Sequence, residues 1–129
     1  MFIDPKQAYL DTRATSSVAG ASPHKLISLL FDSCQEKLAI AKGCMGRGDI
    51  RKKAEAIKKA IDIIVRLQAS LDFDQGGKIA TQLDDLYTFC TNRLALANAV
   101  NDTGMIDEVY KVIAEIKSGW RELEGFERL

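Results

Sequence analysis

Proline is scarce in this chain of 129 residues, and its two prolines, Pro5 and Pro23, both stand near the N-terminus. Because proline interrupts a helix interior, the rest of the chain is free to form uninterrupted helices. The sequence also lacks an apolar run of about 18 residues, so no membrane-spanning helix is expected. The N-terminal residues lack the basic stretch and apolar core of a signal peptide. We therefore expect a cytoplasmic protein, of a length typical of one domain.

An excess of charge of one sign is lacking as well, because 18 basic and 18 acidic residues give a formal net charge of zero. Nucleic-acid-binding domains are usually basic, so nucleic acid is not expected as a partner. The single histidine, His24, has no Glu-x-x-His partner, and we interpret it as a solvated first-turn residue. The cysteines, Cys34, Cys44 and Cys90, show no C-x-x-C spacing, so we interpret them as reduced thiols. No metal, no cofactor and no enzyme activity are expected.

Four segments repeat apolar residues at helical spacings of three and four, and no strand pattern competes with them. The first helix is expected to begin at Pro23, after an N-cap at Ser22. The second covers about residues 50–71, the third about residues 78–100, and the fourth follows the turn sequence NDTG. Four helices joined by short loops predict an all-α fold, an antiparallel four-helix bundle.

We expect the bundle to occupy residues 22–125, with a C-terminal tail at 126–129. Residues 1–21 are interpreted as a mobile N-terminal arm, because most of them are small, polar and without helical periodicity. Within the arm, Pro5 can start a short helix that carries Tyr9 and Leu10. These two side chains would give the arm an apolar anchor.

The sequence SLDFDQGGKIAT places two adjacent glycines, Gly76 and Gly77, between the second and third helices. It lacks the glycine–lysine spacing of a phosphate-binding loop, and no strand precedes it. Glycine adopts a left-handed backbone conformation without strain. The pair is therefore predicted to end the second helix and to allow a tight reversal into the third.

The second helix has an unusually wide apolar face. Its main stripe and a second set of apolar residues together cover about 200° of the helix, where an ordinary surface helix shows about 100°. The main stripe consists of Ile50, Ala54, Ile57, Ile61, Ile64 and Leu71. The second set consists of Ala56, Ala60, Ile63 and Leu67, and Lys53 is the one charge inside the arc. Two interpretations remain open: the whole arc is core, or part of it lines an exposed groove for an amphipathic helix of a partner.

The third helix also has more apolar surface than one core-facing stripe requires, with Tyr87, Phe89, Leu96 and Val100 spread around it. Its residues expected to face the core are Ile79, Leu83, Leu86, Phe89, Cys90, Leu94 and Ala97. The candidate partner-binding residues are Tyr9, Leu10, Ala56, Ala60, Ile63, Leu67, Tyr87, Phe89 and Leu96. Trp120 is interpreted as a core residue.

The densest basic run, RKKAEAIKK at residues 51–59, begins the second helix. Its cations fall mostly on the polar side, which indicates a solvated face. However, cations at a helix N-terminus oppose the helix dipole. A weak contact with an acidic partner is the alternative.

Five stretches occur in order that together resemble the FliS family of flagellin export chaperones: AYLDT, ASPHKLISLLFD, LDFDQGGKIATQLDDLY, ALANAVND and IKSGWREL. The resemblance covers nearly the whole chain. It implies a cytosolic bundle that binds the C-terminal segment of flagellin, prevents premature polymerisation and delivers the subunit to a component of the flagellar type III export gate. It also implies that the segment around Tyr9 helps to determine partner binding.

The chain departs from the family pattern in two places. Ser33 and Cys34 stand where glycine and alanine are frequent, and Phe89 and Cys90 stand in a place that is often more aromatic or methionine-rich. The alternative function is a regulatory adaptor that sequesters another flagellar or transcriptional factor on the same bundle.

Overall fold

The computed structural model describes residues 22–122 as four helices: α3 (Pro23–Arg47), α4 (Ile50–Ala69), α5 (Phe73–Val100) and α6 (Thr103–Glu122). No strand occurs within that range. The expected all-α four-helix architecture is therefore confirmed. The predicted N-terminal arm and C-terminal tail, at 1–21 and 126–129, lie outside the described residues.

The helices begin where side-chain oxygens can cap them. Ser22 accepts a hydrogen bond from the backbone N–H of Lys25, as expected, and Asp49 accepts one from Lys52. Asp72 and Asp102 likewise accept backbone hydrogen bonds at the starts of α5 and α6. Since the first amides of a helix have no partners within it, these oxygens stabilise each start by about 1 kcal/mol.

Two helices end at a residue in the left-handed conformation: Gly48 after α3, with φ of 73°, and Asn101 after α5, with φ of 57°. The backbone N–H of each donates back to a carbonyl in the last turn, which satisfies groups the helix leaves open. Gly46 lies inside α3 and does not interrupt it.

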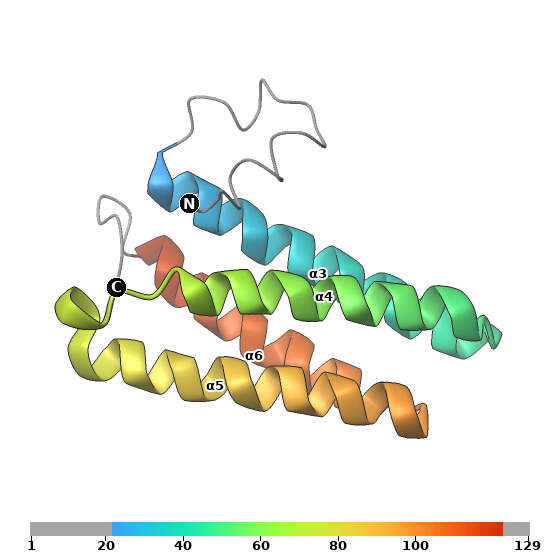
Figure 1. Ribbon diagram of the computed structural model, residues 1–129. Coiled ribbons are helices and arrows are strands. Elements are labelled where there is room, and N and C mark those ends of the chain that lie inside the picture. Colours follow the sequence, from blue (N-terminus) through green and yellow to red (C-terminus); the bar gives the residue numbers. More distant parts are fainter. Residues whose placement is uncertain (1–21, 123–129) are drawn as a thin grey trace.

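Each helix runs antiparallel to the next helix along the chain (Figure 1). The α3–α4 and α5–α6 turns lie at one end of the bundle, while the start of α3, the α4–α5 link and the end of α6 lie at the other. Along the chain each helix packs against the next, and α6 returns to pack against α3. α4 is therefore in contact with both α3 and α5.

This position of α4 explains its wide apolar arc. The second apolar set is buried, with exposed fractions of 4% for Ala56, 0% for Ala60, 8% for Ile63 and 1% for Leu67. Ile57 and Ile64 of the main stripe are buried too. Of the two interpretations, the structure supports the core. Ile50 was wrongly assigned to it, since it is 70% exposed.

α4 ends at Ala69, earlier than expected. The backbone of its C-cap residue, Ser70, has the right-handed helical conformation, so no glycine is needed there. Instead Gly77 lies inside α5, with φ of 51° and ψ of −123°, and produces a kink between a first turn at Phe73 and the main helix from Lys78. The prediction that the two glycines end the second helix is therefore wrong. The need for a glycine with positive φ is confirmed at Gly77 alone.

Replacing Gly77 by alanine should lower the free energy of unfolding by roughly 1–3 kcal/mol, because a Cβ strains the backbone at this φ and ψ. No atom outside the local backbone lies within 4 Å of the added Cβ, so the cost is conformational and not steric crowding by neighbours. Urea denaturation of both single variants is the measurement. Gly76→Ala is the control, because Gly76 has no positive φ. Equal stability of the two variants would contradict the assignment.

Candidate functional site

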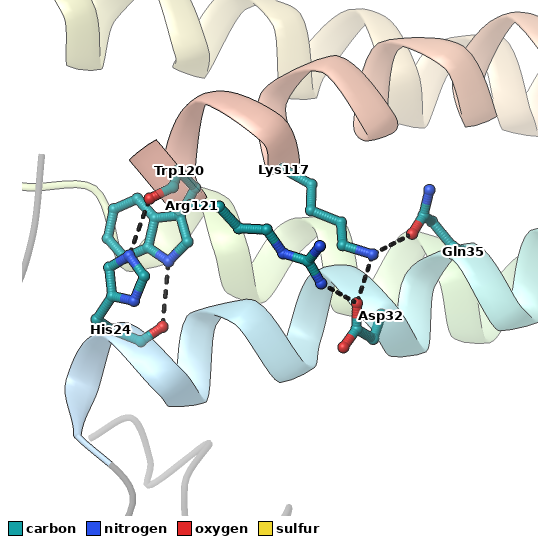
Figure 2. Close-up of polar contacts among 6 residues, drawn as sticks. All are labelled: His24, Asp32, Gln35, Lys117, Trp120 and Arg121. Carbon is teal, nitrogen blue, oxygen red and sulfur yellow. Dashed lines mark hydrogen bonds and ion pairs between the residues drawn. The ribbon is translucent and has the colours of Figure 1, made fainter. Parts of the chain in front are cut away.

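His24 and Trp120 join the start of α3 to the end of α6 (Figure 2). The rings stack with centroids 4.7 Å apart and planes 9° from parallel. The indole Nε1–H donates to the carbonyl of His24 at 3.1 Å, and Nε2 of His24 lies 2.8 Å from the carbonyl of Trp120. Trp120 is 6% exposed, so its assignment to the core is confirmed. The prediction that His24 is simply solvated is wrong.

A second group of contacts joins the same two helices two to three turns further along α3 (Figure 2). Asp32 of α3 lies 2.7 Å from the ammonium of Lys117 and 3.8 Å from the guanidinium of Arg121. Lys117 also donates to Gln35 at 2.9 Å. The ring and carbonyl of His24 and the carboxylate of Asp32 all contact α6. Both groups of contacts therefore hold the two helices together, and neither shows a nucleophile beside a base.

The three thiols are free and buried. Burial raises the pKa of Cys34 to about 12 and that of Cys90 to about 11, and for Cys34 the nearby Cys90 adds to the effect. Burial likewise raises the pKa of Tyr87. A thiol reacts as a nucleophile or binds metal as the thiolate, so these residues are poorly suited to either role. Across residues 22–122, no cluster of three or more metal-ligating side chains occurs.

The feature that remains is an apolar surface on α5. Phe73 in the first turn of this helix is 51% exposed, and beyond the kink at Gly77 five more large apolar side chains lie exposed, with exposed fractions between 38% and 55%. They are Ile79, Leu86, Phe89, Leu96 and Val100, which we call the α5 stripe. Ile79, Leu86 and Val100 occupy one heptad position, and Phe89 and Leu96 occupy another. This 3–4 spacing is typical of a helix that packs along a second helix.

Arg93 marks the side of α5 on which the stripe lies. It stands seven residues after Leu86 and seven before Val100, so it shares their face. Its Nε lies 3.4 Å from Glu108 of α6, and its guanidinium lies 5.2 Å from the centre of the Phe89 ring. The stripe therefore borders α6, and Arg93 is the one cation among its apolar side chains.

The predicted partner-binding residues fall into three groups. Tyr9 and Leu10 lie outside the described residues, and the four α4 residues are in the core. Tyr87 is also buried, at 3% exposed. Phe89 and Leu96 are exposed, and the structure brings them together in the α5 stripe. Their role in binding stays a prediction.

The prediction that Ile79, Leu86 and Phe89 face the core is wrong, because all three are exposed. Val100 was expected outside the core-facing stripe and is exposed, but it was not among the candidate partner-binding residues. The core face of α5 consists of Ala80, Tyr87, Cys90, Leu94 and Ala97. Three of these five side chains are small, so a prediction based on hydrophobicity assigned larger residues of the helix to the core. The heptad spacing of the exposed set was the signal that could have found it.

Lys53 is a buried cation at the other end of the bundle from the His24–Trp120 contact. It is 5% exposed, and its ammonium donates to the carbonyl of Asn98 at 3.0 Å and to Oδ1 of Asn101 at 3.1 Å. These acceptors lie at the C-terminal end of α5, where cations are favourable. The charge inside the apolar arc of α4 therefore joins two helices. The other cations of the basic run, Arg51, Lys52, Lys58 and Lys59, are exposed, as expected of a solvated face.

The part of the chain described is thus a helical bundle with buried thiols and an exposed apolar stripe, an architecture typical of domains that bind other proteins. None of the helices there is long and apolar enough to cross a membrane.

Comparison with known proteins specifies the class further. Residues 5–126 match the family described as flagellar protein FliS. The flagellar secretion chaperone FliS of Vibrio cholerae is 41% identical over 117 residues, which is 91% of this chain and 86% of that protein. FliSB of Pseudomonas aeruginosa is 44% identical over 112 residues, covering 87% and 89%. FliS of Salmonella typhimurium is 41% identical over 118 residues, covering 91% and 87%. The chain belongs to the FliS family of flagellar secretion chaperones, and the resemblance of its sequence motifs is confirmed.

Replacing Trp120 by phenylalanine should lower the free energy of unfolding by about 1–2 kcal/mol. The His24 carbonyl would lose its hydrogen-bond donor, and the smaller phenyl ring would fill less of the space that the indole occupies. Thermal denaturation followed by circular dichroism measures the change. Tyr110→Phe is the control: it removes a hydroxyl from an aromatic that is 40% exposed, and should change stability by less than about 0.5 kcal/mol. Wild-type stability of Trp120→Phe would contradict a stabilising role of the contact.

The raised thiol pKa values predict instability at alkaline pH. Above the ordinary thiol value of 9.0, the unfolded chain loses protons that Cys34 and Cys90 retain in the native state. The unfolded state then binds fewer protons, so the free energy of unfolding should fall by roughly 2–4 kcal/mol between pH 9 and pH 10.5. Urea denaturation across this range measures it. In a Cys34→Ala, Cys90→Ala variant the decline should be shallower, and an unchanged slope would refute the assignment.

Proposed function

We propose that this chain binds the C-terminal segment of flagellin in the bacterial cytosol, prevents its premature polymerisation and keeps it competent for flagellar type III export. The observation that carries the proposal is the α5 stripe. Its apolar side chains are exposed over about 30 Å of helix, counting 1.5 Å per residue from Ile79 to Val100. Membership of a family of flagellar secretion chaperones directs the choice of client.

The stripe suits an amphipathic helix of about 20 residues, which would bury its own apolar face against α5. Apolar contact supplies the binding free energy, and Arg93 gives the surface one charged group that an acidic client residue could approach. Ordering a flexible client costs entropy, so the complex stays reversible. Reversibility is what delivery to a component of the export gate requires.

The test is calorimetric titration with a client peptide of about 40 residues, enough for two helices of ordinary length. The peptide covers the C-terminus of the cognate flagellin. Wild-type protein should bind it one to one, with a negative heat-capacity change from apolar burial. Leu96→Asp and Phe89→Asp should each weaken binding by about tenfold or more, because a carboxylate placed in an apolar contact must be desolvated.

Ile40→Asp is the matched control, because Ile40 of α3 and Leu96 are both 44% exposed. It should bind as wild type does. If folded wild-type protein does not bind, flagellin is not the client, and the regulatory adaptor becomes the better hypothesis. If Ile40→Asp weakens binding as much as Leu96→Asp, the α5 stripe is not the contact.

A further inference from the structure

A cavity of about 470 Å³ opens between the α3–α4 turn and the end of α5. Met45, Ile50 and Ala99 supply apolar side chains to its wall, and Lys53, Asn98 and Asn101 supply polar groups. Ile50 is 70% exposed, so an aliphatic side chain stands in water at the cavity. The volume is within the range of small-molecule sites in proteins.

The Lys53 ammonium has three N–H donors, and two of them bind Asn98 and Asn101. Both acceptors are neutral. Among residues 22–122, no carboxylate forms an ion pair with Lys53. Burying an ammonium group is costly unless acceptors or negative charge compensate for it, and the Lys53 residue is only 5% exposed. The cavity wall thus contains a buried cation that has one remaining N–H donor and is held by neutral acceptors at the C-terminal end of α5 rather than by a carboxylate.

The surroundings reinforce the positive sign. Residues 44–53 and 98–102 contain four cations and only two carboxylates, those of Asp49 and Asp102. Both carboxylates already accept backbone hydrogen bonds as helix caps. The basic start of α4, which opposes the helix dipole, is part of this charge. The side chains of these two segments therefore carry a surplus of two positive charges near the cavity.

We propose that this cavity binds a peptide carboxylate borne next to an aliphatic side chain, with the carboxylate on Lys53 and the aliphatic group against Met45 and Ile50. A carboxylate fits better than a phosphate, because a phosphate needs several charged donors and Lys53 has one N–H left. The site goes beyond the proposed function: it lies at the end of α5, and its chemistry is independent of whether the client is flagellin.

The probe is N-acetyl-leucine, which carries both groups, titrated into the full chain and followed by nitrogen–proton correlation spectra. Saturable shifts should appear at the backbone amides of Ala99 and Asn101. N-acetyl-leucinamide keeps the side chain and removes the charge, so it should bind about tenfold more weakly or not at all. Equal shifts with the amide, or none with the acid, would overturn the proposal.

Two variants locate the site. Lys53→Gln should abolish the preference for acid over amide, and its melting curve shows whether the fold survives. Ile50→Asp places a repelling carboxylate on an exposed position and should weaken N-acetyl-leucine binding by about tenfold without unfolding the protein. Val65→Asp, at a position 49% exposed and four turns along α4, is the matched control and should bind normally. Normal binding by Ile50→Asp would overturn the placement.

A last comparison distinguishes the source of the carboxylate. N-acetyl-leucyl-aspartic acid α-amide offers a side-chain carboxylate and no chain-end carboxylate. Binding equal to that of N-acetyl-leucine means that an internal acidic residue suffices, whereas loss of binding identifies the end of a peptide chain as the ligand. Because no flagellin is present, these results stand whatever the outcome of the client titration.

Discussion

The arrangement of the bundle depends on the burial of α4 between α3 and α5. An apolar arc of about twice the ordinary width cannot be covered by one neighbouring helix. Ile57 and Ile64 together with Ile63 and Leu67 are covered only because two helices pack against α4. Once α4 takes this place, α3 and α5 lie on its two sides, and α6 completes the bundle by packing against both of them.

The side-chain sizes of α5 explain why the exposed apolar surface lies on that helix. The core-facing side of α5 offers mainly small side chains, such as Ala80, Cys90 and Ala97, so the helix approaches the core with little bulk. Its larger residues, among them Phe89 and Leu96, are left on a face that borders α6. An apolar surface at heptad spacing has little role within the described bundle, which is why it supports the chaperone proposal.

Polar contacts secure the ends of the bundle. At one end, the stacked rings of His24 and Trp120 exchange hydrogen bonds with each other's backbone. At the other, Lys53 fastens the start of α4 to the last turn of α5. In the first arrangement, the indole N–H, the His24 ring nitrogen Nε2 and both backbone carbonyls each have a hydrogen-bond partner. The second leaves a buried ammonium without a carboxylate partner and with one free N–H donor beside a cavity, and this difference is the reason for proposing a ligand at that end alone.

Local sequence determined the parts of this protein that depend on neighbouring residues. The caps at Ser22 and Asp49, the start at Pro23 and the all-α class follow from spacings of a few residues, and the sequence motifs indicated the family. Tertiary structure decided which apolar residues are core: it buries Ile63 and Leu67 and exposes Ile50 and Ile79. It also brought His24 to Trp120 and Lys53 to Asn98, across 96 and 45 residues of chain. The physical reason is that a helical pattern specifies which residues share a face, whereas only packing against other helices decides which face is covered.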